Sequence, residues 1–166
     1  QRADYVMDIE VNDEKQILTG DEKITYYNNS PDVLNYLWLQ LDQNIFDKNS
    51  DTWAVEQMKI EDKVSRNDLQ DLDPWFDGGF KLEKVEDASG KKLRYTVNKT
   101  MMRIDLEKPL APGGTFTFRI KWWYNINDRM RLGGRSGYEY FEKDSNYLYT
   151  IAQFYPRMVV YMENQG

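Results

Sequence analysis

The sequence predicts an all-β domain, because apolar residues recur at every second position in several segments. Residues 115–122 have the clearest pattern, in which polar residues alternate with Phe116, Phe118, Ile120 and Trp122. Apolar residues with a period of two line one face of a strand. No long stretch of the chain has apolar residues at the 3.6-residue spacing of an amphipathic helix. We therefore expect strands, and no long helix, to form the core of the domain.

Other expected strands have the same alternation. They cover residues 5–11, 93–97 and 102–106, with inward-facing positions at Tyr5, Met7, Ile9, Val11, Leu93, Tyr95, Val97, Met102, Ile104 and Leu106. Residues 34–41 differ, because apolar side chains occupy both parities. A strand of that composition is typical of one covered from two sides.

Turn-forming residues separate these strands at 28–31, 77–79, 87–90 and 111–114. Ser89 and Gly90 predict a hairpin between residues 80–85 and 93–97, and residues 98–100 predict the next tight turn. Residues 112–114 lead into the strand that begins at Thr115. Two acidic segments, 43–53 and 61–79, are expected to be irregular.

Composition limits what this chain can do. Its 166 residues fit one domain, 1–166, and they include no histidine and no cysteine. Histidine triads, catalytic thiols and histidine-bound zinc are therefore excluded within it. The net charge of −6 argues against nucleic acid as a partner. No apolar run reaches the roughly 18–20 residues that a membrane-spanning helix needs.

Two loops could be taken for ion sites. Residues 71–78 gather three carboxylates before Gly78, but their spacing departs from that of an EF-hand calcium loop and includes Pro74. Residues 132–137 are rich in glycine but lack the lysine and spacing of a phosphate-binding loop. We interpret both as surface loops, and we expect no metal ligand and no catalytic residue in this chain.

Consecutive aromatic residues at 122–124 must point to opposite faces of a strand. At least one of them therefore points away from the core that Trp122 joins. Such side chains can stack on sugars, and a free-standing carbohydrate- or ligand-binding module that uses Trp123, Tyr124 or Trp75 is one alternative function. A purely structural or adhesive β module is another.

Several segments resemble the N-terminal β domain of bacterial M1-family (gluzincin) peptidases. Residues 1–9 and 18–20 resemble the first strand of that domain, and residues 20–31 resemble its continuation with glycine, isoleucine, tyrosine, asparagine and serine. Residues 34–44, 133–141 and 151–161 are similar to later segments in the same order. Residues 162–164 match part of the Gly-x-Met-Glu-Asn exopeptidase motif without its glycine, and we interpret that match as a coincidence.

The resemblance implies a saddle-like, mostly antiparallel β-sandwich domain that contains no zinc ligand. It implies that this domain packs on a thermolysin-like catalytic domain, expected downstream of Gly166, and helps to form the cleft for a peptide substrate. The parent protein would then be a zinc-dependent aminopeptidase. Gln153 is the position that best matches a glutamine lining the pocket for the first substrate side chain. Secreted relatives favour a periplasmic or secreted location.

Overall fold

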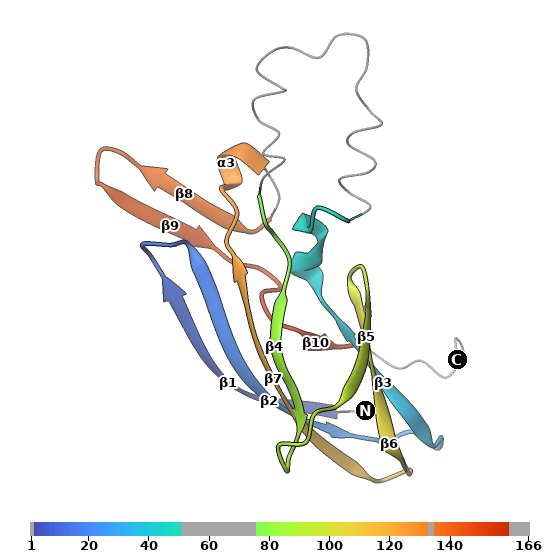
Figure 1. The fold of residues 1–166 in the computed structure, drawn as a ribbon. Helices are drawn as coiled ribbons and strands as arrows, with labels where there is room; N and C mark the ends of the chain where they lie inside the picture. The colour runs from blue at the N-terminus through green and yellow to red at the C-terminus, as the bar shows by residue number, and fades with distance from the viewer. Residues whose placement is uncertain (1, 51–75, 133–134, 160–166) are drawn as a thin grey trace, which may run out of the picture.

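The chain forms two four-stranded antiparallel sheets that pack face to face. The computed structural model describes residues 2–50, 76–132 and 135–159. Sheet A has the order β1 (Arg2–Asn12), β2 (Ile17–Tyr27), β7 (Thr115–Asn125) and β4 (Lys81–Asp87). Sheet B has the order β10 (Arg157–Met158), β3 (Leu34–Gln40), β6 (Met101–Leu110) and β5 (Arg94–Asn98). The predicted all-β, sandwich-like class is confirmed (Figure 1).

Three smaller elements, namely two short helices and one hairpin, lie toward one end of the sandwich, in the upper part of Figure 1. A 3-10 helix, η1 (Asp42–Phe46), follows β3, and a short helix, α3 (Arg129–Leu132), follows β7. β8 (Gly137–Phe141) and β9 (Asn146–Thr150) form a separate hairpin. Within the described residues, no helix has the length and apolar character needed to cross a membrane.

Three connections pass between the two sheets at the opposite end of the sandwich. They join β2 to β3, β4 to β5 and β6 to β7 (Figure 1). Asn28 ties two of them together, since its buried amide donates to the carbonyl oxygens of Asp32 at 2.8 Å and Leu110 at 3.0 Å. The main chain of Asn28 also exchanges hydrogen bonds with Gly113 and Gly114.

The predicted hairpin at Ser89 and Gly90 is only partly correct. The turn forms, and the Leu93 N–H donates to the Val85 carbonyl oxygen at 2.9 Å. Beyond the bridge from Glu86 to Lys92, however, β4 pairs with β7 and β5 pairs with β6. The two strands therefore belong to different sheets. The tight turn at 98–100 is confirmed, because Asn98 pairs directly with Met101.

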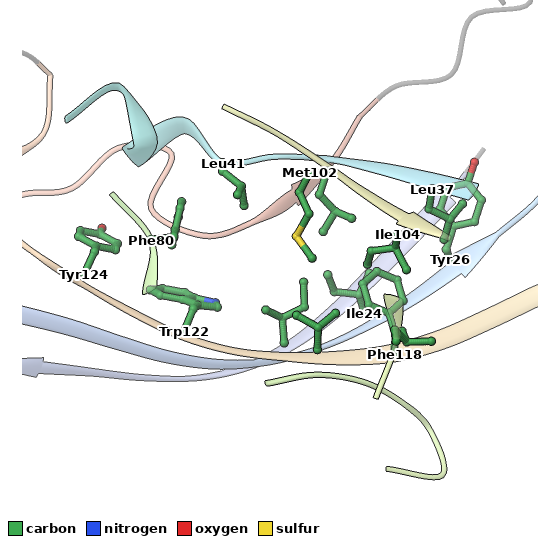
Figure 2. Packing of buried hydrophobic residues seen from close by; sticks show 14 of the residues in the cluster. Ile24, Tyr26, Leu37, Leu41, Phe80, Met102, Ile104, Phe118, Trp122 and Tyr124 are labelled. Carbon is green, nitrogen blue, oxygen red and sulfur yellow. The ribbon is translucent and has the colours of Figure 1, made fainter. Parts of the chain in front are cut away.

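The core lies between the sheets and follows the predicted alternation of β6 and β7. Met102, Ile104, Phe118, Ile120 and Trp122 are all fully buried there (Figure 2). The ring of Phe80 lies edge-on to those of Trp122 and Tyr124, with centroids 5.3 Å away in both cases. Edge-to-face packing of this kind stabilises aromatic cores beyond the area that it buries.

Three of the positions predicted to face inward are exposed. Ile9 and Val11 lie on the core side of β1, opposite Gly20 and Leu18, yet they are 41% and 42% exposed. They stay accessible because β1 is the edge strand of sheet A, and no strand of the described residues lies on its outer side. Val97, on the edge strand β5, is exposed for the same reason.

β3 is the other exception, because it is covered from one side only within the described residues. Leu37 and Leu39 are buried, whereas Tyr36 and Trp38 on the opposite face are 42% and 38% exposed. The Arg103 guanidinium lies 4.4 Å from the centroid of the Tyr36 ring, and this cation–π contact covers part of that face.

Candidate functional site

Gln153 lies in the segment that connects β9 to β10, and its side chain is exposed. Its backbone has a φ of 51°, which is the left-handed region. Residues other than glycine seldom adopt this conformation, and it costs on the order of 1 kcal/mol where it occurs. Such a conformation persists only where surrounding contacts fix the chain.

Two buried polar side chains supply those contacts. The Gln43 amide, from η1, donates to the carbonyl oxygens of Ala152 at 3.0 Å and Gln153 at 3.3 Å. The Ser136 hydroxyl donates to the Ala152 carbonyl and accepts from the Ala152 N–H, both at 2.9 Å. The main chain next to Gln153 is thus held from two directions.

An ion pair and a hydrogen bond also fix the chain that follows Gln153. The Arg157 guanidinium donates to both carboxylate oxygens of Asp42, at 2.7 and 3.3 Å, and to the Gln40 side chain at 3.0 Å. The hydrogen bond to Asp42 raises the pKa of Arg157 above its usual value. This ion pair connects β10 to the start of η1, the same element that carries Gln43.

Tyr5 on β1 contributes a further anchor from sheet A. Its hydroxyl accepts the Met158 N–H at 2.9 Å, and its ring lies edge-on to that of Tyr155, with centroids 5.4 Å apart. Burial raises the pKa of this hydroxyl, so it stays a neutral phenol. Contacts from both sheets therefore fix the segment that contains Gln153.

The exposed side chain of Gln153 can interact with a ligand only through hydrogen bonds. The Gln153 side chain offers one carbonyl acceptor and two N–H donors, and it does not transfer protons near neutral pH. The described residues contain no group of three metal-binding side chains close enough to hold an ion, and the whole chain lacks histidine and cysteine. The donor set available here does not fit a zinc site.

Glu22 is the most perturbed acid among the described residues. It lies on the core face of β2, opposite Met7 and Ile120, and is completely buried. Burial raises the pKa of this carboxyl to about 9, so it is protonated at neutral pH. The nearby Trp122 indole opposes this shift by lowering the pKa, but no hydrogen bond of good geometry forms between the two side chains. A neutral acid in an apolar core is costly and does not contact solvent.

The other sequence-predicted residues do not gather around Gln153. Tyr124 is buried in the core, so it cannot act as a sugar platform. Trp123 points to the outer face of sheet A, beside Thr19 and Lys81, and is half-buried. Trp75, most of the acidic loop at 71–78, the glycines at 133–134 and the residues at 162–164 lie outside the described residues.

Sequence reasoning did not find Gln43, Ser136 or Glu22. Glu22 had a detectable signal, since it shares the parity of Leu18, Ile24 and Tyr26, which the alternation assigns to the core. Gln43 had none, because its partners lie 109 and 110 residues away.

Several solved structures are similar to this chain. They include the M1 zinc metallopeptidase of Deinococcus radiodurans, with a TM-score of 0.47 and 16% identity over 81% of this chain. A mutant of that enzyme bound to a Tyr-Ser-Ala substrate and a two-domain M1 zinc metallopeptidase mutant bound to L-arginine each have a TM-score of 0.46 and 16% identity, over 81% of this chain.

The chain spans only 22–23% of the length of those metallopeptidase chains. No protein-family model matches the sequence, and no curated protein matches it either.

Proposed function

We propose that this chain is the non-catalytic N-terminal β domain of an M1 zinc aminopeptidase. In this proposal it packs on a thermolysin-like catalytic domain of the same polypeptide and helps to form the cleft for a peptide substrate. The zinc and the proton-transfer groups would belong to that other domain, since residues 1–166 include no histidine and no cysteine.

The proposal is supported by the order and spacing of the sequence segments that resemble this family. The surroundings of Gln153 also support it. The one residue that the resemblance assigns to substrate has an exposed side chain on a backbone that Gln43 and Ser136 hold. A fixed backbone removes the entropic cost of ordering the main chain when the side chain binds a ligand, which suits a pocket wall.

A single enzymatic comparison tests this function. The full-length protein should hydrolyse amino-acid arylamides, whereas residues 1–166 alone should bind no zinc stoichiometrically and hydrolyse none of them. In the full-length protein, Gln153→Ala should change KM among substrates with different first side chains more than it changes kcat. Zinc binding or arylamide hydrolysis by residues 1–166 alone would refute the assignment.

The exposed aromatic residues of sheet B favour a second candidate function, a ligand-binding β-sandwich. Tyr36 and Trp38 stand side by side on its outer face, with ring centroids 6.1 Å apart, and Arg103 lies over Tyr36. Aromatic faces beside hydrogen-bonding side chains can bind sugars. A glycan array hit that Trp38→Ala abolishes and Trp123→Ala preserves would support this function; no hit across the array would exclude it for the glycans tested.

A further inference from the structure

We propose that the free edge of β1 binds an extended segment of another protein, in which basic residues alternate with apolar ones. Binding would add a fifth strand to sheet A. This inference is independent of the proposed peptidase role, because it involves neither Gln153 nor a catalytic domain.

β1 is the sheet edge best suited to pairing. It is 11 residues long, and all 11 pair with β2 without a bulge. The other edges are less suitable, since β10 has two residues, β5 has five and β4 has a register shift near Leu82. β1 also lacks proline and lysine, the residues that most often protect an edge from pairing. Figure 1 shows β1 at the border of sheet A.

The outer face of β1 is acidic. Asp4 is paired with Arg2, but among the described residues neither Asp8 nor Glu10 takes part in an ion pair. A strand alongside β1 would place its own outward side chains opposite these two carboxylates. Basic residues there would form favourable cross-strand pairs.

Sheet A already contains a strand with this pattern. In β7, Arg119 and Lys121 alternate with Phe118, Ile120 and Trp122. The Arg119 guanidinium donates to both carboxylate oxygens of Asp21 on the neighbouring strand β2. Asp8 is the cross-strand partner of Asp21, so β1 continues the same acidic row by one strand.

The residues on the core side of β1 indicate that apolar residues should alternate with the basic ones in the partner segment. Ile9 and Val11 lie on that side but are exposed, because no strand among residues 2–50, 76–132 and 135–159 lies beyond β1. An added strand with apolar residues at alternate positions would cover both side chains. Basic residues on one face and apolar residues on the other are therefore the complement of this edge.

A second copy of the chain fits this edge poorly. Antiparallel pairing of two β1 strands about Asp8 would place Asp8 against its own copy, and pairing about Ile9 would place Asp8 against Glu10. Like charges directly opposite one another are destabilising. The acidic row thus favours a basic partner and opposes self-pairing in these two registers, whereas pairing about Tyr5 would place Asp8 against Arg2.

The test uses a fluorescent nine-residue peptide in which lysine alternates with valine, added to the 166-residue chain. We expect saturable binding by fluorescence anisotropy, together with slower hydrogen exchange of β1 amides. The double variant Asp8→Lys/Glu10→Lys should weaken binding by roughly tenfold or more. The matched variant Glu142→Lys/Asp144→Lys makes the same change in net charge in the β8–β9 turn and should change affinity less than about twofold.

Three results would overturn the proposal. The first is equal loss of binding in both double variants, and the second is equal binding of a peptide with the same lysines and valines arranged in two blocks. Either would mean that net charge alone attracts the peptide. The third is a β1-dependent dimer in analytical ultracentrifugation, because a second copy would then occupy the edge. The variant Ile9→Asn/Val11→Asn should also weaken binding, and the circular dichroism of every variant verifies its fold.

Discussion

The side-chain nitrogen of Gln43 lies 3.0 Å from the carbonyl oxygen of Ala152, although 109 residues separate them in the sequence. This hydrogen bond joins the 3-10 helix after β3 to the segment between β9 and β10. Because Gln43 is buried, water cannot replace it easily if the bond is broken.

Replacing Gln43 should therefore destabilise the domain. We expect Gln43→Ala to lower the free energy of unfolding by about 1–3 kcal/mol, since the Gln153 carbonyl loses this donor and a buried space opens. Urea denaturation followed by tryptophan fluorescence measures the change. Gln153→Ala is the matched control: its exposed side chain should contribute less than about 0.5 kcal/mol. Equal effects of the two changes would show that the segment is not held by Gln43.

The left-handed backbone of Gln153 makes a separate prediction. A β-branched residue tolerates this conformation poorly, whereas glycine adopts it freely. Gln153→Ile should be less stable than Gln153→Gly by about 1–2 kcal/mol. The same pair of substitutions at Asn146, which begins β9, should give the opposite order, because isoleucine suits a strand better than glycine does.

Glu22 predicts an unusual dependence of stability on pH. Its folded pKa of about 9 is above the ordinary value of 4.5, so the folded protein binds this proton more tightly than the unfolded chain does. The stabilising contribution of the protonated form is complete below about pH 4.5 and falls as the pH rises toward 9. In Glu22→Gln this loss is absent.

Measured from pH 5 to pH 8, the stability of Glu22→Gln relative to the natural protein should therefore rise by about 4 kcal/mol. Chemical denaturation at several pH values gives this difference directly. Gln43→Ala offers a control, since it removes a buried polar side chain that does not titrate and should keep the pH profile of the natural protein. Parallel profiles for Glu22→Gln and the natural protein would contradict the burial of a neutral acid.

Gly20 is required by the indole of Trp122. A Cβ atom at position 20 would lie 2.2 Å from the ring atom Cζ2, and a fully buried ring has little room to move. We expect Gly20→Ala to cost about 2–4 kcal/mol through overpacking. At Gly90, where nothing lies near the added atom and only the positive φ opposes it, alanine should cost about 1 kcal/mol. Thermal unfolding of both variants measures the contrast.

The one-sided burial of β3 can be tested by two neighbouring substitutions. Leu39→Ala removes a fully buried side chain and should cost about 2–5 kcal/mol. Trp38→Ala removes a larger side chain from the exposed face and should cost about 1 kcal/mol. If Trp38→Ala is as damaging as Leu39→Ala in the 166-residue chain, the outer face of β3 is covered in solution.

The sequence was sufficient to predict the strands whose burial depends on local alternation. The inward positions of β6 and β7 are as expected, because both strands are central in their sheets and one side of each contacts the core. Alternation assigned Ile9 and Val11 to the inward face correctly, but it could not show that β1 is an edge and that both side chains therefore stay exposed. It also could not show that β4 and β5 leave their shared turn toward different sheets, since that depends on partners far along the chain.

The candidate site was less predictable than the fold. The position of Gln153 was inferred from a resemblance, but the side chains that fix its backbone come from η1 and from the residue before β8. Neither Gln43 nor Ser136 belongs to a pattern of charge or hydrophobicity. Their role depends on long-range packing that a single sequence does not encode locally.

The pairing of β2 with β7 has a consequence for synthesis on the ribosome. Thr25 and Thr117 face each other across these strands, although 92 residues separate them. Sheet A therefore cannot be completed until β7 has emerged from the ribosome. Until then, β1 and β2 can pair only with each other as a hairpin. Long-range pairing of this kind slows folding. The acidic row of β1 would help to keep two nascent chains from pairing during that delay.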